Sequence, residues 1–149
     1  MIDILSVIPH RDPFLFVDEI VSISETEILA KKTFSFEKNQ FYRGHYPENP
    51  ITPGVILCES VFQTAAVLLS QKQIAPKNIP TDNSKKLVPV LSKIENARFK
   101  SIVRPGEELL ISVTLLEQIG KFSMLAGVIK KYDNTIVLRI NFTLGYVEE

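Results

Sequence analysis

One continuous apolar segment, residues 53–71, reads PGVILCESVFQTAAVLLSQ. A Pro-Gly pair opens it, and a proline is tolerated there because the first backbone N–H groups of a helix have no partner inside it. The segment predicts one long helix from 55 to about 71. Its apolar arc is wide, so we expect the helix to be mostly buried. The arc comprises Leu57, Cys58, Val61, Phe62, Ala65, Leu68 and Leu69, extended by Ile56, Ala66 and Val67.

Strand patterns lie on both sides of this helix. Residues 14–36 are rich in β-branched and aromatic side chains, and the polar run 24–27 divides them into the two strands of a hairpin. A polar connection, residues 72–86, follows the helix. The remainder predicts four strands in an antiparallel meander with one buried face, near 88–103, 107–118, 121–132 and 135–147.

The turns and the last strand support this division. Asp133-Asn134 has the chemistry of a tight hairpin turn. In the last strand Leu138 and Ile140 alternate with Arg139 and Asn141, the period expected for one buried face. We therefore expect an α+β fold of one domain, 1–149, in which about six antiparallel strands pack on a single helix.

The composition excludes several classes of protein. The 149 residues include 17 basic and 17 acidic side chains, so bulk attraction to nucleic acid or to a membrane surface is not expected. The single cysteine, Cys58, excludes an intrachain disulfide, and no metal-ligand spacing is present. No signal-like start and no long apolar run is present, so we expect a soluble, cytoplasmic protein.

Glu59 is an acid within the apolar helix. An ionised carboxylate is costly to bury unless it is paired, which makes this position notable. Gln63 lies four residues on, on the same helix face, where its amide can hydrogen-bond Glu59 and hold one rotamer. The alternative is an exposed Glu59 stabilised by the helix N-terminal dipole.

The loop before the helix supplies a candidate base. His45 stands between Gly44 and the Tyr46-Pro47 pair, a context that fixes where the imidazole points. Histidine is the side chain best suited to move protons near neutral pH. Gly54, at the helix N-terminus with its free N–H groups, allows a carbonyl oxygen to approach closely. His10 is the other histidine, and its neighbours give it no role.

These motifs together resemble the 3-hydroxyacyl-(acyl carrier protein) dehydratases of fatty acid synthesis, the FabZ type with a hot-dog fold. The resemblance covers nearly the whole chain in the family's order. The matching blocks are residues 8–18 (IPHRDPFLFVD), 44–47 (GHYP) with Pro50, 53–57 (PGVIL) with Glu59 and Gln63, and 97–100 (ARFK) with Pro105-Gly106.

The resemblance implies a sheet wrapped around the helix and dehydration of a (3R)-hydroxyacyl thioester to the trans-2-enoyl product. His45 would act as base and Glu59 as acid. Gly54, Gln63, Phe62 and Tyr46 would bind substrate, with the acyl chain in an apolar tunnel. It also implies that two subunits share each site in a homodimer, assembled as a trimer of dimers, and that neither metal nor organic cofactor is needed.

The implied partner is acyl carrier protein, which is acidic and presents its substrate on 4'-phosphopantetheine. Because the net charge of this chain is zero, a docking patch must come from local arrangement. Arg98 and Lys100 alternate with apolar residues and so share one strand face, and Arg104 follows. These three cations are the predicted docking residues; a merely solvated strand face is the alternative.

Two departures from the family pattern concern the tunnel. Phe62 stands where the family has a small residue, and residues 91–93 (LSK) replace an aromatic, an alanine and a glycine, so the preferred acyl length is left open. Two other functions remain alternatives: a hot-dog acyl thioesterase, and an acyl-binding protein without catalysis.

Overall fold

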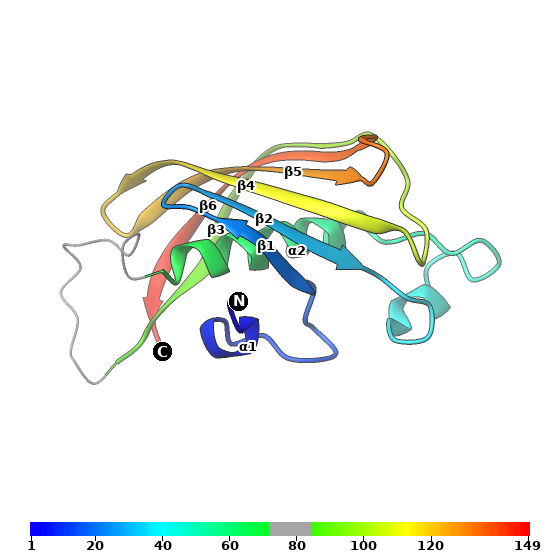
Figure 1. Ribbon diagram of the computed structural model, residues 1–149, viewed down its shortest axis with the longest axis horizontal. Helices are drawn as coiled ribbons and strands as arrows, with labels where there is room; N and C mark the ends of the chain where they lie inside the picture. The colour runs from blue at the N-terminus through cyan, green and yellow to red at the C-terminus, as the bar shows by residue number, and fades with distance from the viewer. Residues whose placement is uncertain (72–84) are drawn as a thin grey trace.

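The computed structural model describes residues 1–71 and 85–149 as a curved antiparallel sheet wrapped around one long helix (Figure 1). This helix, α2, spans Gly54–Leu69, and two short helices precede it, α1 (Ile4–Val7) and the 3-10 helix η1 (Gln40–Arg43). The strands of the described part are β1 (Glu19–Ile23), β2 (Glu27–Thr33), β3 (Leu87–Phe99), β4 (Glu108–Ile119), β5 (Phe122–Lys131) and β6 (Ile136–Glu148). The predicted α+β class is confirmed.

The order of strands in the sheet is β1-β2-β4-β5-β6-β3, all neighbours antiparallel. The predicted β1–β2 hairpin and the β4–β5–β6 meander are confirmed. The first step of the predicted meander is wrong, because β3 pairs with β6 rather than β4. The segment 100–107 instead crosses the start of α2, where Thr52 N donates to Val103 O at 2.8 Å and Gly106 N donates to Phe34 O at 2.7 Å. These bonds also explain why β3 ends at Phe99 and not at 103.

Helix α2 begins and ends close to the predicted positions. It ends at Leu69, and the hydroxyl of the next residue, Ser70, donates to Ala66 O at 2.6 Å and lies 3.0 Å from Val7 O. Most of the polar connection predicted after it, residues 72–84, lies outside the described residues. None of the helices in 1–71 and 85–149 is long and apolar enough to cross a membrane.

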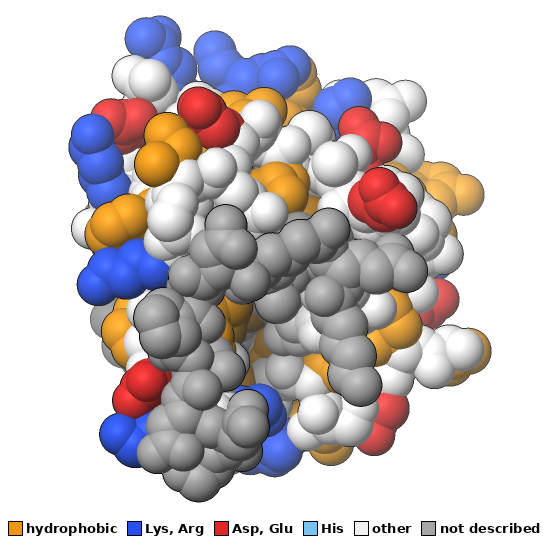
Figure 2. Space-filling view, turned by 90° about the vertical axis from the view of Figure 1, so that its left-hand side faces the viewer, with side chains coloured by type: hydrophobic (Ala, Val, Ile, Leu, Met, Phe, Trp, Pro, Cys, Tyr) orange, Lys and Arg blue, Asp and Glu red, His pale blue; other side chains and the backbone are white. Residues whose placement is uncertain are grey.

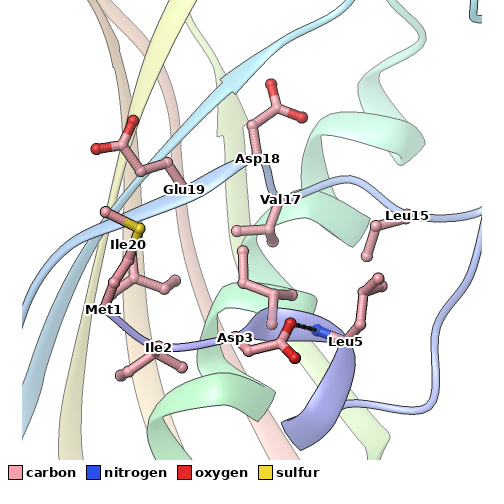
Figure 3. A pocket seen from close by; sticks show the side chains of 10 residues that line it. Met1, Ile2, Asp3, Leu5, Leu15, Val17, Asp18, Glu19 and Ile20 are labelled. Carbon is pink, nitrogen blue, oxygen red and sulfur yellow. Dashed lines mark hydrogen bonds between the residues drawn. The ribbon is translucent and has the colours of Figure 1, made fainter.

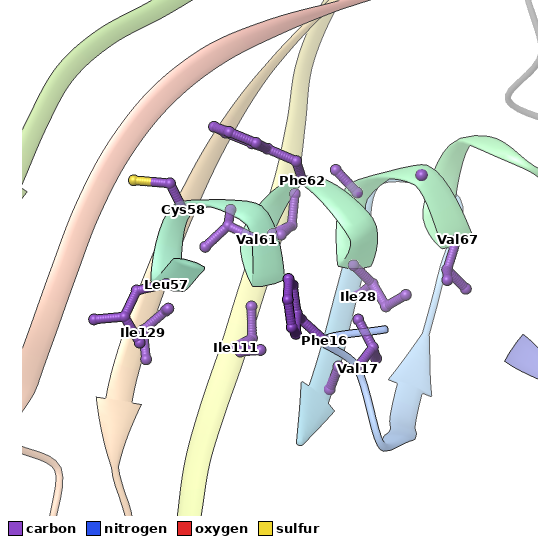
Figure 4. Close-up of a cluster of buried hydrophobic side chains, with 14 of the residues drawn as sticks. Phe16, Val17, Ile28, Leu57, Cys58, Val61, Phe62, Val67, Ile111 and Ile129 are labelled. Carbon is purple, nitrogen blue, oxygen red and sulfur yellow. The ribbon is translucent and has the colours of Figure 1, made fainter. Parts of the chain in front are cut away.

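The core lies between α2 and the inner face of the sheet. Every side chain from Ser60 to Leu69 is buried, as the helix pattern predicted. Figure 4 shows Phe62 and Cys58 on the side of α2 opposite Phe16. The predicted alternation in β6 is confirmed, since Leu138 and Ile140 are buried while Arg139 is exposed.

Gly127 in β5 sets the distance between the sheet and α2. A Cβ atom added there would lie 2.3 Å from Cγ1 of Val61. Val61 is β-branched and stiff in a helix, so it cannot rotate away. We therefore expect Gly127→Ala to lower the free energy of unfolding by about 1–3 kcal/mol in urea titrations.

The matched control is Gly44→Ala in the loop before α2. No heavy atom lies within 4 Å of a Cβ built at Gly44 among the atoms described, and its φ of −108° suits any residue. We expect it to change stability by less than about 0.5 kcal/mol. Equal losses in the two variants would contradict the steric argument.

Candidate active site

Glu59 lies on the second turn of α2, and two side chains hold its carboxylate. Gln63 Nε2 donates to Glu59 Oε1 at 3.1 Å, which confirms the predicted hydrogen bond. His10 Nε2 lies 3.5 Å from the same oxygen. The Glu59 side chain is 22% exposed, so it is neither sealed in the core nor free in solvent. A held carboxylate with partial access can exchange a proton with a ligand.

Both polar atoms of the Gln63 amide form hydrogen bonds within the chain. Its oxygen accepts from Phe16 N at 2.7 Å, and its nitrogen donates to Phe14 O at 3.1 Å as well as to Glu59. Ser60, one turn earlier, donates to Phe16 O at 2.8 Å. These bonds fasten the segment around Phe14 to the helix and fix the amide. Gln63 is therefore suited to orient Glu59 rather than to contact substrate.

His10 lies beside Glu59, although no role was predicted for it from the sequence. Its ring stacks on Phe14 with centroids 6.3 Å apart, and its Nδ1 is buried without a hydrogen-bond partner among the described residues. In the sequence, His10 lies four residues before Phe14. In the structure, Gln63 holds the carbonyl of Phe14, and this bond brings the segment with His10 to α2. The structure thus gives the acid a histidine neighbour from its own chain.

His45 lies in the loop between η1 and α2, with its tautomer determined by a backbone contact. Its Nδ1 lies 2.7 Å from Ile51 O. A carbonyl oxygen only accepts, so Nδ1 carries the proton and donates it. Nε2 is then unprotonated in the neutral ring and free to act as a base. Tyr46 packs edge-on against His45 at 4.8 Å and is 63% exposed.

Hydrogen bonds hold the His45 loop at both of its ends. Buried Tyr42 hydrogen-bonds Thr52 at the other end of the loop, and burial raises the pKa of the Tyr42 hydroxyl. Arg104 donates to Asn49 in the same loop. Arg104, a predicted docking residue, is thus engaged in holding the loop.

At the N-terminus of α2, Phe99 lies over Gly54. A Cβ at position 54 would lie 2.9 Å from Cε1 of Phe99, so a larger residue there would push this ring aside. The N–H groups of Gly54 and Val55 precede any intrahelical partner, and Pro53 cannot cap them with its side chain. They remain available to polarise a carbonyl oxygen.

The structure of one chain does not bring the two candidate proton carriers together. The polar partners of Glu59 within 1–71 and 85–149 are Gln63 and His10, and the His45 ring bonds to Ile51 O. Within one chain, the base lies on the loop before α2 and the acid faces β3.

Glu59 opens onto an apolar pocket of about 240 Å³ between α2, β3 and β6. Apart from Glu59 and His10 its lining is apolar, which suits a hydrocarbon ligand beside a proton donor. The apolar residues are Pro9, Phe62, Ala66, Val88, Pro89, Val90, Leu91 and Leu144.

A larger pocket, about 470 Å³, lies beside α1 and contains none of the candidate residues (Figure 3). Two of its carboxylates are already engaged: Asp3 accepts from Leu5 N at 3.1 Å, and Asp18 accepts from Lys32 Nζ at 2.7 Å. We therefore place the chemistry at the smaller pocket with Glu59.

Two of the three predicted docking residues lie exposed at the end of β3, Arg98 within the strand and Lys100 directly after it. Arg98 stands directly opposite Arg139 of β6, and neither forms an ion pair with the residues described; the same holds for Lys100. Acidic and basic side chains are interspersed over the face in Figure 2, in keeping with zero net charge. The Arg98–Arg139 pair is a local departure from that mixture.

Cys58 precedes Glu59 but is unsuited to nucleophilic chemistry. Burial raises the pKa of its thiol to about 11, and the neighbouring Glu59 adds to this rise. The thiolate is the nucleophilic form, and it is scarce at neutral pH with such a pKa. Within the described ranges, no three His, Cys, Asp or Glu side chains gather as they would around a metal ion.

A curved antiparallel sheet around one long helix is the hot-dog fold, and solved structures share it. The dehydratase heterocomplex ApeI:P from Xenorhabdus doucetiae matches with a TM-score of 0.78 at 18% identity, covering 99% of this chain and 92% of that one. A hypothetical thioesterase with coenzyme A from Streptococcus pneumoniae matches at 0.65 and 12%, covering 88% and 86%. Both likenesses concern the fold alone.

Sequence comparison defines the family more narrowly. The profile of the FabA-like domain matches residues 8–141, and this chain belongs to that family. The 3-hydroxyacyl-(acyl-carrier-protein) dehydratase FabZ of Thermotoga maritima is 38% identical over 141 residues, 94% of this chain and 92% of the relative. The protein of the same name from Petrotoga mobilis is 35% identical over 126 residues, 85% and 83% of the two chains.

Proposed function

We infer that this chain is a hydro-lyase of fatty acid biosynthesis that dehydrates a (3R)-hydroxyacyl group, carried as a thioester on acyl carrier protein, to the trans-2-enoyl thioester. Relatives with this activity in their names match most of the chain. The observation that carries the proposal is a carboxylate, Glu59, held by Gln63 at the rim of an apolar pocket. A cytoplasmic location remains a prediction from the sequence.

The proposed mechanism divides the elimination between two side chains. His45 Nε2 takes the proton from the carbon next to the thioester carbonyl, and the electrons of that C–H bond form the new double bond. Protonated Glu59 gives its proton to the 3-hydroxyl, and the C–O bond breaks to release water. The Gly54 N–H polarises the carbonyl, which stabilises the enolate-like charge.

The exposed edge of β3 supports a shared site. β3 is the outermost strand beyond β6, and its side chains from Val90 to Phe99 are all exposed. Leu91, Ile94 and Phe99 are 44%, 47% and 53% exposed. A long exposed edge strand with unpaired backbone groups and several apolar side chains favours pairing with another strand. We propose that β3 of a second copy covers this edge and brings His45 of one subunit to Glu59 of the other. Assembly into a trimer of dimers is a further prediction, which native mass measurement tests.

The reaction is tested by offering the purified protein (3R)-hydroxyacyl groups on acyl carrier protein and following the product by mass. The proposal requires loss of one water with the thioester intact. Release of the free carrier thiol would indicate the rival thioesterase, and binding without any turnover would indicate a non-catalytic acyl-binding protein.

We also propose that Arg98 and Lys100 dock the acidic carrier, with Arg139 as a third cation. Like charges directly opposite each other destabilise a sheet, so the Arg98–Arg139 pair is best explained by an anionic partner. We expect Arg98→Glu with Lys100→Glu to raise KM for the carrier-bound substrate by roughly tenfold or more, and to leave turnover of a small free thioester nearly unchanged.

The matched control reverses two cations at the opposite end of β6, Lys86→Glu with Lys121→Glu. Lys86 and Lys121 bond through their carbonyls to Glu149 N and Tyr146 N, so they lie near the end of β6 away from Arg139. The control should retain the wild-type KM. Raised salt should weaken docking through Arg98 and Lys100, because charges are screened over about 8 Å at physiological ionic strength. Equal losses on both substrates in the Arg98/Lys100 variant would show that these residues support the fold or the pocket.

A further inference from the structure

The apolar pocket runs along one face of α2, with the acid at one end. Glu59, Phe62 and Ala66 all line it, and their spacing of three and then four residues keeps them on one side of the helix. The step of seven residues from Glu59 to Ala66 rises about 10 Å along the axis. A hydrocarbon chain whose reacting carbons lie at Glu59 must therefore pass Phe62.

The ring of Phe62 forms a rigid part of the wall of this pocket. Its side chain is only 8% exposed, and its ring packs against Phe142 of β6 with centroids 4.9 Å apart. Figure 4 shows the ring projecting from α2 on the side away from Phe16. Moving it aside would require Phe142 and the close-packed inner face of β6 to rearrange. The ring consequently stays in place when a chain enters.

The size of the pocket limits what fits beside this ring. Its volume of about 240 Å³ is below the range of roughly 300–1,000 Å³ that is usual for pockets that hold drug-sized ligands. Val88 and Pro89 of β3 and Pro9 also line this space. The pocket therefore suits a short acyl chain.

We propose that Phe62 sets the upper limit of acyl length, and that the substrates are short apolar acyl groups rather than long ones. This inference rests on the proposed dehydratase function for its substrate class. The ring that lines the pocket at this position stands where the family pattern has a small residue.

The first test measures kcat/KM for 3-hydroxyhexanoyl and 3-hydroxypalmitoyl groups on acyl carrier protein. The wild type should favour the shorter substrate, and Phe62→Ala should raise the long-to-short ratio by about tenfold or more, since even one methylene changes discrimination by 10–200-fold. Phe62→Leu, which leaves a smaller cavity, should shift the ratio less and serves if the alanine variant does not fold. The ratio within one preparation is independent of the folded fraction.

The control is Phe34→Leu, a buried aromatic that packs on Phe16 and Phe41 away from this pocket. It should leave the length ratio unchanged. A wild type that handles both lengths equally, or a ratio that Phe62→Ala and Phe62→Leu do not move, overturns the proposal.

A second readout separates this inference from the proposed function. Non-reactive thioether analogues of acyl-pantetheine, of increasing chain length, can be titrated by calorimetry. Affinity should fall beyond a short length in the wild type and extend to longer chains in Phe62→Ala. If that shift occurs but no chain is dehydrated, the role of Phe62 in limiting chain length is supported and the proposed dehydratase function is wrong. If the length limit does not shift, Phe62 does not set it, whatever the rate of dehydration.

Discussion

His45→Ala and Glu59→Gln will each lower kcat/KM for dehydration by about 10²–10⁴-fold, because each removes one partner in proton transfer. The structure supports this size of effect at both positions. His45 presents an unprotonated Nε2 through its bond to Ile51 O, and Glu59 is held by Gln63 beside the apolar pocket. Gln at position 59 keeps the shape but cannot supply the proton. Steady-state assays on carrier-bound substrate measure the loss.

The control for the acid is Glu48→Gln, the same chemical change at an exposed position in the His45 loop. It should retain nearly full activity. His10→Gln should fall between, because His10 lies beside the acid and is not itself one of the two proposed proton carriers. Thermal unfolding of every variant should remain near the wild type, since none of these changes opens the core. Normal turnover in either His45→Ala or Glu59→Gln would remove that residue from the mechanism.

The helix and its acid could be predicted from sequence because the signals are local. The apolar run after Pro53-Gly54 gave α2 to within two residues at its end, and the four-residue spacing gave the Glu59–Gln63 bond. The alternation in β6 is likewise a property of neighbouring residues. Helix wheels and strand periods depend on short-range geometry, which one sequence carries in full.

What the sequence did not predict depends on contacts between distant segments. The position of β3 beyond β6 is fixed by the crossing segment, through bonds such as Thr52 N to Val103 O. His10 meets Glu59 because Gln63 fastens the segment around Phe14 to α2. Phe99 over Gly54 is a third case. No local periodicity in the sequence predicts such contacts, since they result from packing of the whole chain.

The separation of His45 from Glu59 leads to the second large effect. In one chain the His45 ring bonds to its own loop, while Glu59 faces the pocket bounded by the exposed strand β3. If β3 pairs with a second copy, the loop of one subunit can reach the acid of the other. In that arrangement every dimer contains two sites, each with a base and an acid from different chains.

Mixing inactive variants tests this arrangement directly. His45→Ala and Glu59→Gln chains, unfolded together and refolded, should regain about a quarter of wild-type activity, because half of randomly formed dimers are mixed and each mixed dimer has one intact site of two. Each variant refolded alone is the control and should remain inactive. Native mass measurement of the mixture, with one variant carrying an affinity tag, confirms that mixed dimers form. Mixed dimers that form and remain inactive would show that base and acid act within one chain, because only then does every site retain a defect.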